Sequence, residues 1–312
     1  MSQSTLPYQI RPGVLDIPGV GVGCVTDDAK ETGVTVVVIP EGSKGAVDVG
    51  GGGPATRETP VLDPANTVQG PDAVVLTGGS ALGLQTADGV AIELLHLGRG
   101  VLVGRARIPI VVAAAIFDLE VGLAEPPSVA DGAAALKMAM TQGHAVKEGR
   151  HGAGRGATVG KSLGPDYAMP GGQGAVTLVT PDGLRVGAVV VVNAVGSIID
   201  DDGSILAGPR VAGTPQNTVA IWSMGAPGLR QGEATTIGGI VTNAALTKAE
   251  LARVSRMGHD GLARAIDPVH SPWDGDTLFA LSVGDRQEDV GRVGALAAHA
   301  VTLAVRRGVR VS

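Results

Sequence analysis

Cysteine and aromatic residues are scarce in this sequence of 312 residues. The single cysteine, Cys24, excludes an internal disulfide, and on that ground we expect a cytoplasmic protein. Aromatic residues make up 2% of the chain, whereas hydrophobic residues as a whole make up 44%. The core must therefore be built from small aliphatic side chains, and the 49 glycines indicate many turns and close backbone approaches.

The features of a nucleic-acid-binding or membrane protein are missing as well. The formal net charge is -6, and the Lys and Arg residues are scattered rather than clustered as phosphate recognition requires. The longest apolar runs, such as 34–39 and 186–192, are far shorter than the roughly 20 residues of a transmembrane helix. No basic patch followed by an apolar stretch opens the chain, so we expect no secretory signal. From the charge distribution and the short apolar runs we expect no nucleic-acid partner and no membrane partner.

Several common catalytic signatures are also absent. Segment 154–162 looks like a phosphate-binding loop, but Arg155 occupies a position that requires glycine, so nucleotide binding is disfavoured. Gly79-Ser80 is not followed by the glycine of a nucleophile elbow, which disfavours a typical Ser-His-Asp hydrolase. The histidines show no metal-ligand spacing, so we expect neither a metal nor another cofactor. They are His96, His144, His151, His259, His270 and His299.

The hydrophobic pattern predicts strands and helices in mixed order. Short β-branched or alternating runs predict strands at 34–39, 73–76, 174–180, 184–192, 236–242 and 276–283. Apolar residues at helical spacing predict helices over 82–98, from the capping box Thr247 to Glu250 onward, and over 290–307.

Two longer segments lack this regularity. Residues 143–174 are rich in glycine and read as an ordered loop or hairpin region. Residues 204–232 read as an exposed connector with one short strand at 218–222. Because strands and helices do not alternate regularly, the sequence predicts a layered α+β sandwich rather than a doubly wound sheet.

The segments near the end of the chain are the most informative. Residues 234–243, Ala-Thr-Thr-Ile-Gly-Gly-Ile-Val-Thr-Asn, precede the capped helix, and Asp274-Gly275-Asp276 follows it. Taken alone, these are a threonine-rich strand and an Asp-Gly turn. Together with ordered motifs elsewhere, they resemble the L-aminopeptidase/D-esterase family, which includes β-peptidyl aminopeptidases and the nylon-oligomer endohydrolase. The other matching segments are 16–20, 32–36, 56–59, 76–81, 156–161 and 192–196.

The resemblance implies the αββα sandwich of N-terminal-nucleophile hydrolases, formed by residues 1–312 as a single domain. It also implies self-cleavage into residues 1–234 (α chain) and 235–312 (β chain). The hydroxyl of Thr235 would attack the carbonyl of Ala234, and the freed threonine would then be the catalytic nucleophile, with its own amine as general base. Processed protomers would assemble as a homo-oligomer, expected to be a tetramer.

The resemblance further implies roles for individual side chains. Asp274 and Asp276 would orient and tune the amine and hydroxyl of Thr235. Lys161 would add positive charge beside the nucleophile, and Asn193 would donate a hydrogen bond to the developing oxyanion. Four residues would line the substrate cleft: Gly78, Gly79, Ser80 and Phe117.

Two positions depart from the family pattern. Ala234 stands where many relatives carry asparagine, so an unprocessed, inactive precursor is one alternative. Phe117 stands where some relatives place a tyrosine near the oxyanion, and a phenyl ring cannot donate a hydrogen bond. Asn217-Thr218 is an alternative cut site, although it lacks the strand and capped helix that follow the nucleophile.

The expected substrates are small amides: short peptides and amino-acid amides or esters, cleaved at the amino terminus. Linear 6-aminohexanoate (nylon) oligomers are the alternative that the same residue set implies. An acyltransferase resembling the ornithine acetyltransferases fits the motifs less well.

Overall fold

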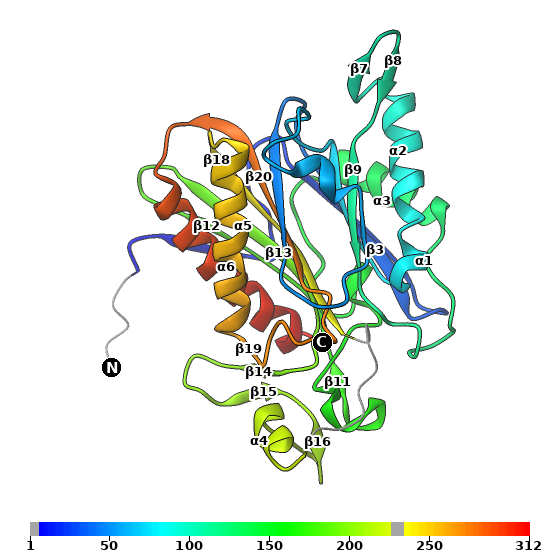
Figure 1. Cartoon of the computed structure of the whole chain (residues 1–312), viewed down its shortest axis with the longest axis vertical. Helices are drawn as coiled ribbons and strands as arrows, with labels where there is room; N and C mark the ends of the chain where they lie inside the picture. The colour runs from blue at the N-terminus through cyan, green and yellow to red at the C-terminus, as the bar shows by residue number, and fades with distance from the viewer. Residues whose placement is uncertain (1–5, 226–233) are drawn as a thin grey trace.

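The computed structural model describes residues 6–225 and 234–312, which form two stacked β-sheets between two pairs of helices (Figure 1). The first sheet has the order β1-β12-β13-β18-β20-β4 and the second the order β2-β3-β6-β9-β5. Neighbouring strands are antiparallel except for the pairs β18–β20 and β6–β9, which are parallel. The first sheet comprises β1 (Gln9–Pro12), β12 (Gly172–Val179), β13 (Arg185–Asn193), β18 (Thr235–Ala244), β20 (Thr277–Arg286) and β4 (Lys44–Val49).

The outer layers are helical. Helices α5 (Lys248–Ala263) and α6 (Val290–Arg310) cover the first sheet, and α2 (Thr86–His96) and α3 (Val129–Gln142) cover the second (Figure 1). The second sheet comprises β2 (Gly21–Asp27), β3 (Thr32–Val38), β6 (Ala73–Thr77), β9 (Val111–Ala115) and β5 (Thr56–Arg57). This αββα arrangement confirms the predicted layered sandwich.

Strand β13 shows how small residues build the core. Val190 and Val192 pack toward α5 and α6, whereas Val189 and Val191 pack into the space between the two sheets. Because both faces of β13 are buried, it reads as a continuous valine run rather than an alternating pattern. A Cβ on Gly174 of β12 would lie 2.1 Å from the carbonyl oxygen of Ala304, so glycine lets α6 lie close to the sheet.

The expected strands and helices are confirmed with one error, and several elements were not expected, among them the strands β2, β4 and β9. Residues 218–222 are not a strand, because they belong to helix α4 (Thr218–Ser223). The side chain of Asn217 accepts a hydrogen bond from the N–H of Ala220 at 2.9 Å, and this cap outweighs the β-branched composition. Helix α3 was not predicted, although Ser128 and Asp131 form a capping box at its start.

The irregular segments contain short elements. Residues 143–174 hold the small hairpin of β10 and β11, as expected, and the described part of 204–232 ends at Gly225. No helix among the described residues is long and apolar enough to span a membrane. The remaining elements are α1 (Ser80–Gly83), β7 (Val101–Val103), β8 (Ala106–Ile108), β10 (Thr158–Val159), β11 (Met169–Pro170), β14 (Ser197–Ile199), β15 (Ile205–Ala207), β16 (Arg210–Val211), β17 (Thr214–Pro215) and β19 (Ile266–Asp267).

Candidate active site

Three central strands of the first sheet bring the predicted site residues together. Strand β13 is antiparallel to β18, so Asn193, its last residue, pairs with Thr235, the first residue of β18. Strand β20 is parallel to β18, so the residues just before it lie at the same edge, where Asp274 forms a bridge with Ala234. The sheet topology therefore places residues from three distant segments around the Ala234–Thr235 peptide bond.

The carbonyl group of Ala234 is held by two hydrogen-bond donors. The N–H of Gly275 donates to its oxygen at 2.9 Å, and the hydroxyl of Thr235 donates to the same oxygen. Ala234 and Thr235 are both buried. A main-chain N–H aimed at a carbonyl oxygen can stabilise the negative charge that forms there when the carbonyl carbon is attacked.

Two buried carboxylates lie beside this peptide. One oxygen of Asp274 accepts from the N–H of Ser271 at 2.9 Å and from its hydroxyl, while the other accepts from the N–H of Val195 at 3.4 Å. Asp276 accepts a 2.6 Å hydrogen bond from the N–H of Thr236, the residue after the candidate nucleophile. Burial, together with the charge of Asp276, raises the pKa of Asp274 to about 6.

Lys161 and Asn193 form a second buried pair at the site. The ammonium of Lys161 donates to the side-chain oxygen of Asn193 at 2.8 Å, and the N–H of Thr158 donates to the same oxygen at 2.9 Å. These two donors fix the orientation of the Asn193 amide. Its nitrogen donates to the carbonyl oxygen of Phe117 at 3.1 Å, so one of its two N–H groups is already engaged.

The Gly78-Gly79-Ser80 turn is attached to the site through Asp118. The carboxylate of Asp118 accepts from the N–H of Gly79 at 2.6 Å and from the hydroxyl of Thr32 at 2.7 Å. Gly79 has a φ of 81°, a left-handed conformation that favours glycine. Burial raises the pKa of Asp118 above its ordinary value, although its hydrogen bonds from Thr32 and Gly79 oppose this shift.

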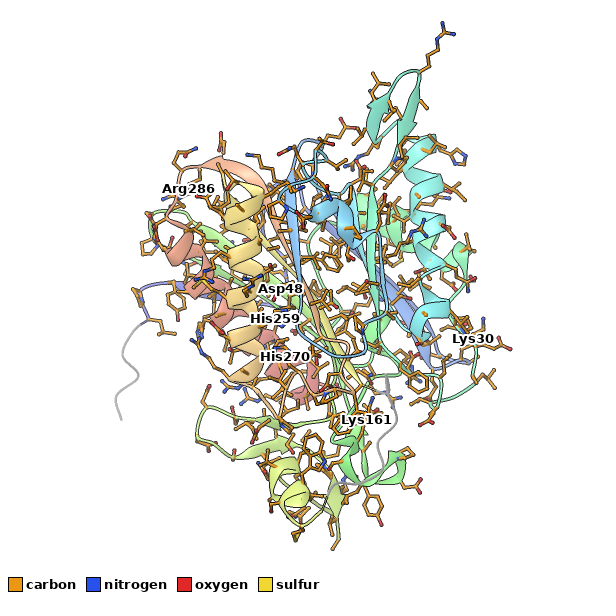
Figure 2. The ribbon with its side chains drawn as sticks, viewed as in Figure 1. Lys30, Asp48, Lys161, His259, His270 and Arg286 are labelled. Atoms are coloured by element: carbon orange, nitrogen blue, oxygen red, sulfur yellow. The ribbon has the colours of Figure 1, made fainter. Side chains whose placement is uncertain are left out.

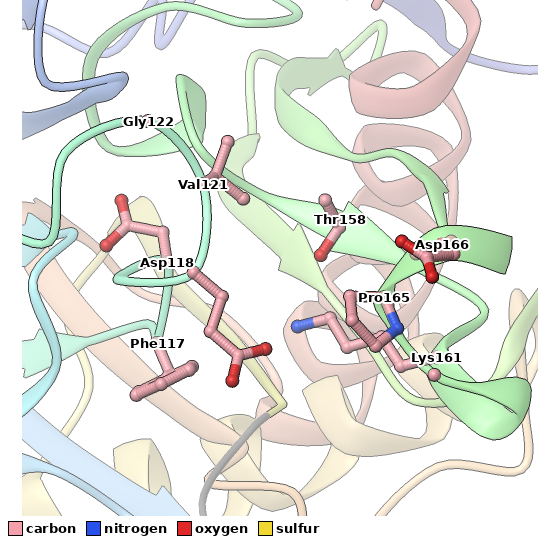
Figure 3. Close-up of a pocket in the computed structure, with 11 residues that line it drawn as sticks. Phe117, Asp118, Val121, Gly122, Thr158, Lys161, Pro165 and Asp166 are labelled. Carbon is pink, nitrogen blue, oxygen red and sulfur yellow. The ribbon is translucent and has the colours of Figure 1, made fainter.

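A cavity of about 370 Å³ opens beside Lys161 (Figure 3). The charged groups in its lining are the ammonium of Lys161 and the carboxyl groups of Asp118, Glu120 and Asp166. Phe117 is part of the lining, whereas Gly78, Gly79 and Ser80 are not among the lining residues, and Gly79 reaches the cavity only through its N–H contact with Asp118. The role of these four residues in lining the substrate cleft stays a prediction. The full lining is Phe117, Asp118, Glu120, Val121, Gly122, Thr158, Lys161, Gly164, Pro165, Asp166 and Ala168.

The profile of peptidase family S58 matches residues 13–310 of the chain. The chain belongs to peptidase family S58. An uncharacterized aminopeptidase of Mycobacterium leprae is 41% identical over 299 residues, covering 87% of this chain and 78% of that protein. The 6-aminohexanoate-oligomer endohydrolase of Paenarthrobacter ureafaciens is 33% identical over 277 residues, covering 86% of this chain and 74% of that protein. The S58 assignment makes the chain a hydrolase and confirms the resemblance found in its motifs.

Solved structures support the fold of this S58 peptidase. A Burkholderia sp. β-aminopeptidase superposes with a TM-score of 0.68 at 19% identity, covering 94% of this chain and 84% of that one. The L-aminopeptidase D-Ala-esterase/amidase of Ochrobactrum anthropi, described as a variant of the Ntn hydrolase fold, gives 0.65 at 18% identity, with the same coverage. Both confirm the expected N-terminal-nucleophile sandwich.

A glycine segment of this S58 peptidase, 50–53, runs against the acidic loop of residues 274–276 and was not expected from the sequence. The N–H of Gly50 donates to the carbonyl oxygen of Asp276 at 2.9 Å, and the N–H of Gly53 donates to that of Asp274 at 2.8 Å. A Cβ on Gly51 would lie 2.3 Å from the carbonyl oxygen of Asp274, so only glycine permits this approach. The run of four glycines after a short strand is the signal that could have revealed it.

Two histidines, which the sequence excluded only as metal ligands, also lie at residues 274–276. The N–H and ring Nδ1 of His270 contact Asp276 at 3.1 and 2.8 Å, and His259 lies 3.1 Å from the far side of the His270 ring. Their spacing in the sequence carries no signal, because one lies on α5 and the other in a loop. Among the described residues, no group of three or more His, Cys, Asp or Glu side chains is arranged to hold a metal ion.

Proposed function

We propose that this S58 peptidase cuts its own chain between Ala234 and Thr235 and then uses Thr235 to release amino-terminal residues from short peptides and amino-acid amides or esters. The observation that carries the proposal is the contact between the Thr235 hydroxyl and the carbonyl group of Ala234, whose oxygen also accepts the N–H of Gly275. Nucleophile, scissile carbonyl and oxyanion donor are thus already adjacent before the cut.

This geometry supports self-cleavage by direct attack of the hydroxyl. The Thr235 oxygen adds to the carbonyl carbon of Ala234, and the C–N bond breaks as the nitrogen of Thr235 takes up a proton. The resulting ester is opened by water, which leaves a carboxylate on Ala234 and restores the hydroxyl. Because the oxyanion donor is the main-chain N–H of Gly275, an asparagine side chain at position 234 is not required for this step. This favours processing into residues 1–234 and 235–312 over a stalled precursor.

The freed Thr235 can then act on substrates. Its amine, with a reference pKa of about 7.7 to 8.0, is matched to accept the hydroxyl proton near neutral pH. Asp276 holds the adjoining peptide group through the N–H of Thr236, and Asp274 lies beside it with its pKa raised to about 6. The buried ammonium of Lys161 lies next to Asn193, which pairs with Thr235 across the sheet, and adds positive charge where the oxyanion develops.

The cavity beside Lys161 favours substrates with a free amino group. Three carboxyl groups line it, and Asp118 already accepts hydrogen bonds from Gly79 and Thr32. This leaves the carboxyl groups of Glu120 and Asp166, and we propose Glu120 as the group that binds the substrate ammonium. An ammonium bound there would anchor the amino-terminal residue beside Lys161, whose partner Asn193 pairs with Thr235 across the sheet, and an aminopeptidase requires such an anchor.

The 6-aminohexanoate-oligomer endohydrolase among the relatives supports a second candidate substrate. A linear 6-aminohexanoate oligomer also carries a free ammonium, several methylene groups away from its first amide. The aminopeptidase relative is the more similar in sequence, at 41% against 33% identity, and it favours peptide substrates.

Processed protein assayed with L-aminoacyl p-nitroanilides tests the proposal. We expect turnover of the free-amine substrate, at least tenfold slower turnover of its N-acetylated form, and no turnover by Thr235→Ala. Glu120→Gln should raise KM for the free-amine substrate by about tenfold and leave the N-acetylated one unaffected. Equal rates for wild type and Thr235→Ala would refute the proposal, and faster cleavage of 6-aminohexanoate oligomers would favour the second substrate.

We also propose that the processed protein is a homo-oligomer, a tetramer by resemblance to the family. The hairpin of β7 and β8 projects from the body of the protein (Figure 1) and exposes the aliphatic side chains of Leu102 and Val103, which are 63% and 61% accessible. Exposed aliphatic side chains of this kind fit a contact between copies. Light scattering of wild type and Leu102→Asp tests this, since the variant should give a lower mass.

A further inference from the structure

Asp276 is held by three N–H groups, and two of them belong to one histidine. The N–H of Thr236 donates to its Oδ1 at 2.6 Å, while the main-chain N–H of His270 and its ring Nδ1 reach Oδ2 at 3.1 and 2.8 Å. Asp276 is 1% exposed, so these contacts take the place of water around its charge. His270 adopts a left-handed conformation, with φ of 57°, that lets both of its groups reach the same oxygen.

The contacts continue from His270 through His259 of α5 to Asp48 of β4. Ring Nε2 of His270 lies 3.1 Å from Nδ1 of His259, and Nε2 of His259 lies 3.1 Å from the carbonyl oxygen of Asp48. Figure 2 shows Asp48, His259 and His270 in succession. Both rings press against Gly50, where a Cβ would lie 2.9 Å from His270 and 3.1 Å from His259.

Counting protons along these contacts gives the charge of the pair. This series of hydrogen bonds ends in an acceptor on each side, the Asp276 carboxylate and the Asp48 carbonyl. The ring nitrogen next to each acceptor must therefore carry a proton. The contact between the two rings needs a third proton, because one nitrogen must donate to the other. Two neutral imidazoles carry only two protons, so the complete chain of hydrogen bonds contains one positive charge.

We propose that His259 and His270 are positioning residues that share one excess proton, and that this proton fixes the Asp276 carboxylate against the Thr235–Thr236 peptide group. The inference rests on the proposed role of Thr235 as nucleophile. When the excess proton is lost, one of the three contacts along the chain has to break. Even if another contact breaks, the bond from the His270 ring to Asp276 is then no longer charge-assisted, so the peptide group that follows the nucleophile is held less firmly.

The surrounding charges place the excess proton on His270. Burial lowers the pKa of His270, but the hydrogen bond and charge of Asp276 outweigh burial, and the net shift is upward. Asp274 and Asp48 add to this upward shift. The pKa of His259 is lowered by burial and by the charge of His270, although the carbonyl and carboxylate of Asp48 and the charge of Asp276 oppose this.

Arg256 completes the set of charged groups around the histidine pair. Its guanidinium lies 3.3 Å from the Asp48 carboxylate, which it partly neutralises, and that carboxylate is 3.8 Å from the His259 ring. The charged groups facing the pair are therefore Asp48, Arg256, Asp274 and Asp276. The nearest of them is Asp276, so the positive charge belongs on the ring that contacts it.

Two substitutions at His259 separate positioning from mere packing. His259→Leu removes the acceptor for His270, so we expect kcat to fall roughly 10-fold to 100-fold, the usual cost of losing a hydrogen bond to a charged group. The alkaline limb of the pH profile of kcat should also move to lower pH in this variant, while KM stays nearly constant. His259→Gln can accept from His270 and donate to Asp48 without titrating, so it should restore most of kcat. His299→Gln, in α6 and outside this chain of contacts, is the matched control and should keep the wild-type pH profile.

Nitrogen-15 NMR of histidine-labelled protein tests the shared proton directly. Near pH 7 we expect one imidazolium and one neutral ring from this pair, in wild type and in Thr235→Ala alike. Two neutral rings, or an unchanged kcat and pH profile in a folded His259→Leu, would overturn the inference. If Thr235→Ala remains active, the proposed function fails, while the NMR signature still decides the state of the histidines.

Discussion

Replacing Gly275 by alanine should block self-cleavage. Gly275 donates its N–H to the carbonyl oxygen of Ala234, and a Cβ there would lie 2.8 Å from both the Thr235 hydroxyl oxygen and the carbonyl oxygen of Gly53. Both contacts are shorter than van der Waals packing allows, so the hydroxyl or the loop has to move by several tenths of an ångström. The φ of Gly275 is not in the left-handed region, so the effect comes from these contacts rather than from backbone strain.

The expected size of the effect follows from what the methyl group displaces. Loss of one oxyanion donor typically slows a reaction by about 10²–10³-fold, and a misplacement of about 1 Å costs roughly 10²-fold. We therefore expect the cleavage rate of Gly275→Ala, followed by intact mass over time, to fall by at least about 100-fold. The variant should still fold, as judged by circular dichroism.

Gly239→Ala is the matched control for Gly275→Ala. It lies on β18, the strand that begins with Thr235, and its added Cβ would meet only a methyl group of Val189, at 3.9 Å. We expect it to cleave at the wild-type rate with unchanged or slightly higher stability. Wild-type cleavage by Gly275→Ala would refute the proposed geometry of attack.

Three further predictions concern buried charges. The three N–H groups of the Lys248 ammonium are surrounded by four main-chain carbonyl oxygens at 2.6 to 3.2 Å. Lys248→Met should therefore lower stability by about 3 kcal/mol in thermal or urea denaturation, and an unchanged midpoint would contradict this. Asp118→Asn leaves Gly79 or Thr32 without its acceptor, so stability should drop by about 1–3 kcal/mol and KM should rise. Asp274 has its pKa raised to about 6, so the stability it contributes is present below pH 4 and is lost as pH rises through 6. Between pH 4 and 7 the free energy of unfolding of wild type should accordingly fall by up to about 3 kcal/mol relative to that of Asp274→Asn. A parallel pH dependence of the two free energies would refute the shift.

The elements that could be predicted from sequence are those fixed by local pattern. The valine run of β13 and the Thr247 capping box of α5 each contain their own signal, and both are confirmed. Helix α4 was mistaken for a strand because Thr218, Val219 and Ile221 favour strands, while the cap from Asn217 decides the outcome. Local composition therefore fails where one capping side chain sets the backbone.

In the candidate site, too, local motifs identify residues, whereas contacts between distant segments could not be predicted. Motif resemblance named Thr235, Asp274 and Asp276, and the structure brings these residues together. The direction of the Asn193 amide could not be predicted, because it depends on donors from a separate segment. The contact of His259 with His270 was equally out of reach, since it depends on how α5 packs against the loop before β20.

Mapping the new amino terminus tests the central claim most directly. Intact mass and amino-terminal sequencing of freshly purified wild type, Thr235→Ala and Ala234→Asn should be followed over days. We predict that wild type resolves into residues 1–234 and 235–312 with threonine at the new terminus, and that Thr235→Ala stays whole. Cleavage of Ala234→Asn alone would identify wild type as a stalled precursor. A cut before Thr218, or no cut in either protein, would contradict Thr235 as the nucleophile.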